Sequence, residues 1–90
     1  MKDHILIVED DLVNQRLNKK MIQSAGYQVT VADDGLQALD LVEKQSFELV
    51  VLDVMMPKID GYETCRRLRR KKSTTRVPIL MLTSLDSVEN

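Results

Sequence analysis

Several residue types are scarce in this 90-residue sequence, which has one cysteine, two prolines, three glycines and no tryptophan. The lone Cys65 cannot form an internal disulfide, which fits a reducing compartment. Uninterrupted apolar runs stop after about four residues, far short of the roughly 20 that cross a bilayer. The N-terminus also lacks the basic region and long apolar stretch of a secretory signal, so we expect a cytoplasmic protein that does not enter a membrane.

An excess of charge of one sign is lacking as well. The 13 Lys and Arg residues are balanced by 14 Asp and Glu residues, for a net charge of −1. This balance gives no electrostatic basis for binding nucleic acid or an anionic membrane surface. With 43% hydrophobic residues the chain is too apolar for a disordered protein, and its length leaves room for a single domain spanning residues 1–90.

Four short apolar segments rich in β-branched residues predict strands, and they cover residues 5–8, 28–32, 47–52 and 79–82. The first and third are typical of strands buried on both faces of a sheet. Polar residues also follow these strands, and those that follow the first, third and fourth are Glu9 and Asp10, Asp53, and Thr83.

Helical periodicity fills the intervals between these strands. Apolar residues recur every three to four positions over 12–25, which predicts an amphipathic helix that Gly26 terminates. A second helix is expected after residues 33–35, where an aspartate can cap it. A third helix is expected over 62–70, and we interpret Asp60 as its N-cap.

The resulting order β-α-β-α-β-α-β predicts a doubly wound α/β fold with a parallel sheet and helices on both faces. In such folds, ligands bind beyond the carboxyl ends of the strands, where the strand order reverses. With strand order 2-1-3-4, the first, third and fourth strands are neighbours about 4.8 Å apart. Glu9, Asp10, Asp53 and Thr83 are then expected to meet in one cleft.

Carboxylates gathered in this way indicate a cation site, because they repel one another unless a cation neutralises them. Hard oxygen ligands suit Mg²⁺, which keeps several waters and is often shared with a phosphate. His4 and Cys65 are single and far apart in the sequence, so no zinc site is indicated. A metal-bound carboxylate beside a hydroxyl suggests phosphoryl transfer to an aspartate.

Three segments carry a resemblance to a known family. They are IVEDD at 7–11, VVLDVMMPKIDG at 50–61 and PILMLTS at 78–84. In this order and at these strand ends, they closely resemble the receiver domain of two-component response regulators, and D-x-M-M-P-x-x-D-G is the most specific of the matches. The resemblance runs from about residue 2 to residue 90 and implies the flavodoxin-like topology of that family.

The resemblance also implies roles for individual residues. Asp53 looks like the phosphoacceptor, which takes a phosphoryl group from a sensor histidine kinase or a histidine phosphotransfer protein. Glu9 and Asp10 resemble the acidic pair that holds Mg²⁺ together with Asp53 and the backbone carbonyl of Met55. Thr83 resembles the switch hydroxyl that binds the phosphoryl group. A protein of this kind is a signalling module and not an enzyme.

Members of the family continue with a fifth strand, a lysine after it and a last helix, whereas this sequence ends at Asn90. We therefore expect a receiver domain that is C-terminally incomplete, and any contact with nucleic acid would need an output domain absent here. An alternative interpretation is a truncated or engineered fragment that mainly self-associates. The strand at 79–82 would then be an apolar sheet edge that pairs with another copy in a dimer or higher oligomer.

Two other classes of protein fit the residues less well. Phosphatases with an aspartate nucleophile carry a D-x-D motif that begins at the nucleophile. The corresponding segment here, Asp53-Val54-Met55, lacks the second carboxylate. A flavin-binding protein of the same topology would need Ser, Thr and Gly around a phosphate after the first strand, where this sequence is acidic.

A run of seven basic residues with no acidic residue occupies 66–76. We interpret it as the solvated end of the third helix, where cations complement the helix dipole. No aromatic residues interleave with it to support stacking on nucleic-acid bases.

Overall fold

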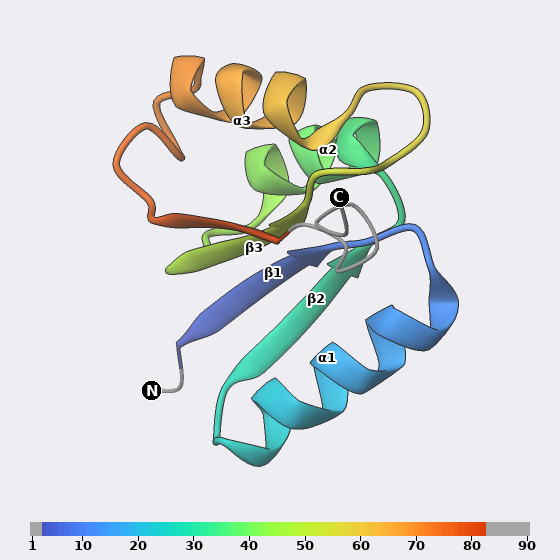
Figure 1. The fold of residues 1–90 in the computed structure, drawn as a ribbon. Coiled ribbons are helices and arrows are strands. Elements are labelled where there is room, and N and C mark those ends of the chain that lie inside the picture. The colour runs from blue at the N-terminus through green and yellow to red at the C-terminus, as the bar shows by residue number, and fades with distance from the viewer. Residues whose placement is uncertain (1–2, 83–90) are drawn as a thin grey trace.

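The computed structural model describes residues 3–82, in which four strands alternate with three helices (Figure 1). The strands are β1 (His4–Val8), β2 (Gln28–Ala32), β3 (Leu49–Asp53) and β4 (Ile79–Leu82). The helices are α1 (Leu12–Ser24), α2 (Gly35–Lys44) and α3 (Gly61–Arg70). All seven predicted elements are present, and none of the three helices is long and apolar enough to cross a membrane.

The strands form one parallel sheet in the order β2-β1-β3-β4, as the sequence predicts. The register places Val8 of β1 beside Ala32 of β2 and Leu52 of β3. The carboxyl ends of these three strands therefore lie level with one another. Helix α1 lies on one face of the sheet, and α2 and α3 lie on the other (Figure 1). This arrangement is the predicted doubly wound α/β fold.

The sheet separates two groups of buried apolar side chains. The larger group lies on the side of α2 and α3 and includes Leu6, Val8, Val50, Leu52 and Leu68. The smaller group contains Ile5, Ile7 and Val51. Alternate residues of β1 and β3 supply the two groups, because successive side chains of a strand point to opposite faces. Continuous apolar runs therefore occur in the two central strands.

Helix α1 buries few of the apolar residues that predicted it. Its exposed apolar side chains are Leu12, Val13, Leu17 and Met21, each at least 60% accessible. Its only buried side chain is that of Gln15. The apolar spacing thus predicted the helix correctly but does not identify the side chain that is buried.

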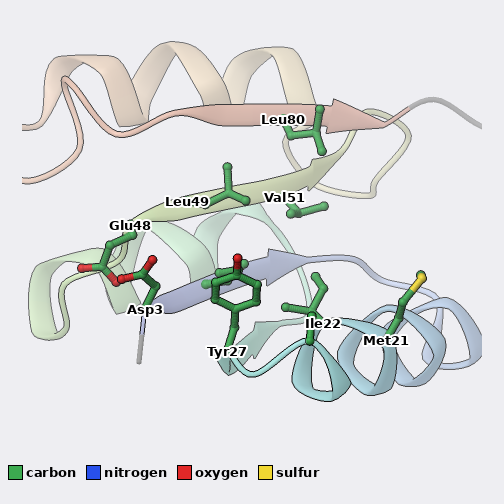
Figure 2. A pocket seen from close by; sticks show the side chains of 10 residues that line it. Asp3, Met21, Ile22, Tyr27, Glu48, Leu49, Val51 and Leu80 are labelled. Atoms are coloured by element: carbon green, nitrogen blue, oxygen red, sulfur yellow. The ribbon is translucent and has the colours of Figure 1, made fainter. Parts of the chain in front are cut away.

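A groove of about 460 Å³ lies between α1 and the outer half of the sheet (Figure 2). Apolar side chains dominate its lining, with Met21 and Ile22 from α1 and Leu49, Val51 and Leu80 from β3 and β4. Within residues 3–82 no helix packs over β4 on this face. The described part of the chain therefore leaves this apolar surface uncovered.

Each helix begins after an aspartate that caps it. The caps are Asp11, Asp34 and Asp60, and each carboxylate accepts a hydrogen bond from the backbone N–H three residues later. A cap of this type contributes about 1 kcal/mol to stability. At the other end of α1, Gly26 has a φ of 100°, the left-handed conformation that favours glycine. The expected capping role of Asp60 is confirmed.

Most of the basic run on α3 is engaged within the domain. Arg66 and Arg67 both pair with Glu63 on the same helix. Arg69 donates to three backbone carbonyls of the following turn, and Lys71 pairs with a glutamate of α2. These contacts support the interpretation of this run as a structural feature of the helix end.

Candidate acidic site at the carboxyl edge of the sheet

Three carboxylates meet at the carboxyl edge of the two central strands. Glu9 and Asp10 directly follow β1, and Asp53 is the last residue of the neighbouring β3. One carboxylate oxygen from each residue lies within 4.8 Å of the other two. Glu9 is buried, Asp53 is half-buried and Asp10 is exposed. The cluster is therefore open to solvent on one side, where a ligand can enter.

Backbone hydrogen bonds orient this cluster. The N–H of Glu9 donates to the carbonyl of Ala32, 3.0 Å away, which extends the pairing of β1 with β2 by one residue. The Glu9 carboxylate accepts the N–H of Asp11 at 3.2 Å. The Asp53 carboxylate accepts the N–H of Met55 at 3.3 Å. Two of the three acidic side chains are thus held by the loop that follows their own strand.

The electrostatics of the site are unfavourable for three negative charges. The pKa of Glu9 is raised from 4.5 to about 7, mainly because the carboxyl is buried. The carboxylates of Asp53 and Asp10 raise this pKa further, whereas the hydrogen bond from the Asp11 N–H opposes the shift. A bound cation would relieve this repulsion.

The donor set fits Mg²⁺. Three carboxylates supply hard oxygen ligands, and the exposed side leaves room for the waters that Mg²⁺ retains. The predicted fourth donor is the backbone carbonyl of Met55, whose N–H binds Asp53 and whose side chain is exposed. The ligand role of that carbonyl stays a prediction. Thr83 lies outside the described residues 3–82, so its switch role also stays a prediction.

The loop after β3 packs directly against the start of α3. The N–H of Gly61 donates to the carbonyl of Val54 at 2.9 Å. A Cβ at position 61 would lie 2.5 Å from the carbonyl oxygen of Asp53 and 2.6 Å from the Cα of Val54. Only glycine allows this approach of the helix to the backbone that carries Asp53.

A second link holds the same loop, and it was not predicted from the sequence. Lys58 adopts a φ of 68°, and its Nζ lies 2.9 Å from a carboxylate oxygen of Asp34, the cap of α2. The pKa of Asp34 is lowered, first by the N–H of Gln37 and then by Lys58. Neighbouring residues in the sequence do not reveal this pair, because its partners come from different loops.

Beside the carboxylates is an open hollow of about 550 Å³. Asp10 lines one part of it, and Met55, Pro57 and Tyr62 supply apolar surface. A bulky group that approaches the carboxylates from solvent would contact this apolar surface.

A family model described as "Response regulator receiver domain" matches residues 5–90. The chain therefore belongs to the family of response regulator receiver domains, as its motifs indicate. Receiver domains are signalling modules of two-component systems.

Among curated relatives, the response regulator MprA of Mycobacterium sp. (strain KMS) is 44% identical over 88 residues, covering 98% of this chain and 37% of the relative. The chain spans about a third of the length of the curated relatives that it matches. Two solved structures are similar over most of their length. The receiver domain of sensor histidine kinase PA1611 from Pseudomonas aeruginosa has a TM-score of 0.89 and 38% identity, covering 100% of this chain and 76% of its own.

The second solved structure is response regulator TrrA from Thermotoga maritima, with a TM-score of 0.87 and 34% identity, covering 97% of this chain and 73% of its own. It is described in complex with Mg²⁺ and BeF. The PA1611 domain is described with a magnesium ion coordinated in the active site cleft. Related receiver domains therefore hold Mg²⁺, and this chain carries an acidic cluster of matching chemistry.

Proposed function

We propose that this receiver domain is a phosphoacceptor that uses Mg²⁺ and carries the phosphoryl group on Asp53. The observation that carries the proposal is the convergence of Glu9, Asp10 and Asp53 within 4.8 Å at adjacent strand ends. We assign Asp53 as the acceptor because it is half-buried and ends β3 close to the carboxylates of Glu9 and Asp10. Glu9 and Asp10 would hold Mg²⁺ together with Asp53 and the Met55 carbonyl.

The transfer replaces one bond to phosphorus with another. A carboxylate oxygen of Asp53 attacks the phosphorus of a phosphohistidine, the new O–P bond forms, and the N–P bond to the imidazole breaks. Mg²⁺ supplies positive charge that offsets the charge on the phosphoryl oxygens. The N–H of Met55 holds one oxygen of Asp53 and so orients this carboxylate.

The phosphodonor in this proposal is a sensor histidine kinase or a histidine phosphotransfer protein in the cytoplasm. The hollow lined by Met55, Pro57 and Tyr62 offers apolar surface against which such a donor could pack. Thr83 is proposed to bind the phosphoryl group and to report it to a partner or an output domain. Contact with nucleic acid would belong to an output domain and not to this chain.

The acceptor assignment is tested by Asp53→Asn. Wild-type protein incubated with Mg²⁺ and acetyl phosphate is expected to gain one phosphoryl group in an intact mass measurement, and the variant is expected to gain none. Asp60→Asn is the matched control, because it removes a carboxylate from the same loop while Asn still caps α3. Equal gain in wild type and in Asp53→Asn would overturn the assignment.

Self-association is a second candidate property, favoured by the exposed Leu80 and Leu82 on β4. Within residues 3–82, β4 is one of the two outer strands and pairs only with β3. We propose that this edge pairs with a second copy of the chain to give a dimer or higher oligomer.

Light scattering at micromolar concentration tests this proposal. Leu80→Lys is expected to shift the chain towards monomer, because a charge beside the edge opposes strand pairing. Val13→Lys places the same charge at an exposed apolar position of α1 and should leave assembly unchanged. A monomeric wild type would contradict the proposal.

A further inference from the structure

Gln15 is the only buried side chain of α1 and is 8% exposed, although the apolar residues around it face solvent. A polar side chain is buried at a cost unless its hydrogen bonds are satisfied. Leu12, Val13 and Leu17 of the same helix stay exposed while the amide of Gln15 is buried. We therefore expect the amide to have specific hydrogen-bond partners.

The partners of Gln15 come from the two loops beside the carboxylate cluster. Its Nε2 donates to the backbone carbonyl of Glu9 at 2.5 Å and to a carboxylate oxygen of Asp33 at 2.7 Å. Both hydrogens of the amide are thus used. Asp33 is fixed in turn, because its N–H donates to the side chain of Gln37 on α2. Gln15 therefore connects α1, the loop after β1 and the loop after β2.

These contacts fix the peptide groups on both sides of the Glu9 Cα. The N–H of Glu9 donates to Ala32, and its carbonyl accepts from Gln15. The remaining freedom is in the side chain, and the Asp11 N–H holds the carboxylate of that side chain. By holding the Glu9 carbonyl, Gln15 helps to orient the Glu9 side chain relative to the sheet. Glu9 is the buried member of the cluster.

We propose that Gln15 is a positioning residue for the cation site, acting through the Glu9 carbonyl and never contacting the cation itself. The inference rests on the proposed function, since it assigns Gln15 to the Mg²⁺ site of that function. Without the amide, the Glu9 carbonyl loses its partner and the loop that carries Glu9 and Asp10 can rotate. Outer contacts of this kind typically change metal affinity by about tenfold or more.

Gln15→Met tests the proposal, because it keeps the length of the side chain and removes both donors. Calorimetric titration with Mg²⁺ is expected to give a dissociation constant about tenfold higher than that of wild type. Gln23→Met, at an exposed position of the same helix, is the matched control and should bind like wild type.

A second variant keeps the test valid where Gln15→Met folds poorly. Asp33→Ala removes one partner of Gln15 at an exposed position, and we expect it to weaken Mg²⁺ binding by about threefold. Unfolding is measured in EDTA for every variant. A merely structural role would lower the unfolding midpoint and leave the Mg²⁺ affinity of the folded chain unchanged, and that result would overturn the proposal.

Phosphorylation gives an independent comparison. Gln15→Met should need more Mg²⁺ for half-maximal labelling of Asp53, yet reach the wild-type rate at saturating Mg²⁺. A lower rate at saturation would contradict a role in cation positioning. Failure of wild type to be labelled would instead contradict the phosphoacceptor proposal, and the calorimetric test of Gln15 would still stand.

Discussion

Substitution of Gly61 by alanine is expected to destabilise the domain by about 3 kcal/mol and to weaken Mg²⁺ binding as well. The added Cβ would lie 2.5 Å from the carbonyl oxygen of Asp53 and 2.6 Å from the Cα of Val54. Both atoms belong to backbone, so no side chain can turn aside to relieve the clash. The strain would move either α3 or Asp53, the proposed phosphoacceptor.

Gly26→Ala is the control variant, because it also replaces a glycine but introduces no steric clash. Gly26 has a φ of 100°, but a Cβ there meets nothing within 4 Å. Its replacement should cost about 1 kcal/mol and leave Mg²⁺ affinity unchanged. Urea unfolding followed by circular dichroism, with and without Mg²⁺, measures both effects. Equal losses for the two variants would show that the contact at position 61 is unimportant.

The stability of the metal-free protein is expected to fall as the pH rises from about 4.5 to about 7. The pKa of Glu9 is raised from 4.5 to about 7 in the folded state, so the folded protein binds this proton more tightly than the unfolded chain. The resulting stabilisation is fully present below pH 4.5 and is lost as the pH rises through 7. The shift corresponds to about 3 kcal/mol.

Glu9→Gln should remove this pH dependence, because the amide is neutral throughout the range. Above about pH 7 the variant is expected to be more stable than wild type in EDTA, and Mg²⁺ should stabilise wild type far more than the variant. Glu63→Gln is the control, since the pKa of that carboxyl is lowered by Arg66 and Arg67 and it titrates below this window. An unchanged slope of stability against pH in Glu9→Gln would contradict the role assigned to Glu9.

With the strand order 2-1-3-4, the clustering of the acidic residues was predictable for one physical reason. In a parallel sheet, residues that follow neighbouring strands lie at the same edge, so Glu9, Asp10 and Asp53 had to meet once β1 paired with β3. The capping role of Asp60 was predictable because it depends on an N–H only three residues away. Strand patterns and local capping rules were therefore sufficient to predict the acidic cluster and the cap of α3.

The contacts that support the site were not predictable in this way. Gln15 lies between the polar residues Asn14 and Arg16 in the sequence, and its burial depends on a carbonyl and a carboxylate from two different loops. The pair between Lys58 and Asp34 depends on the relative placement of two loops. The exposure of Leu17 on α1 likewise depends on which surfaces cover the sheet, and apolar spacing does not encode that.

The level pairing of Val8 with Leu52 has a consequence for folding. Glu9 and Asp53 are distant in sequence, and the chain between them forms α1, β2 and α2 before β3 is reached. Contacts of such long range form at a large cost in loop-closure entropy. A cation shared by Glu9 and Asp53 would link the two ends of this intervening chain. It would stabilise the protein only after β1 and β3 have paired. Mg²⁺ binding would then report the completion of the sheet, and partly folded chains in which β1 has only β2 as a neighbour would lack the site.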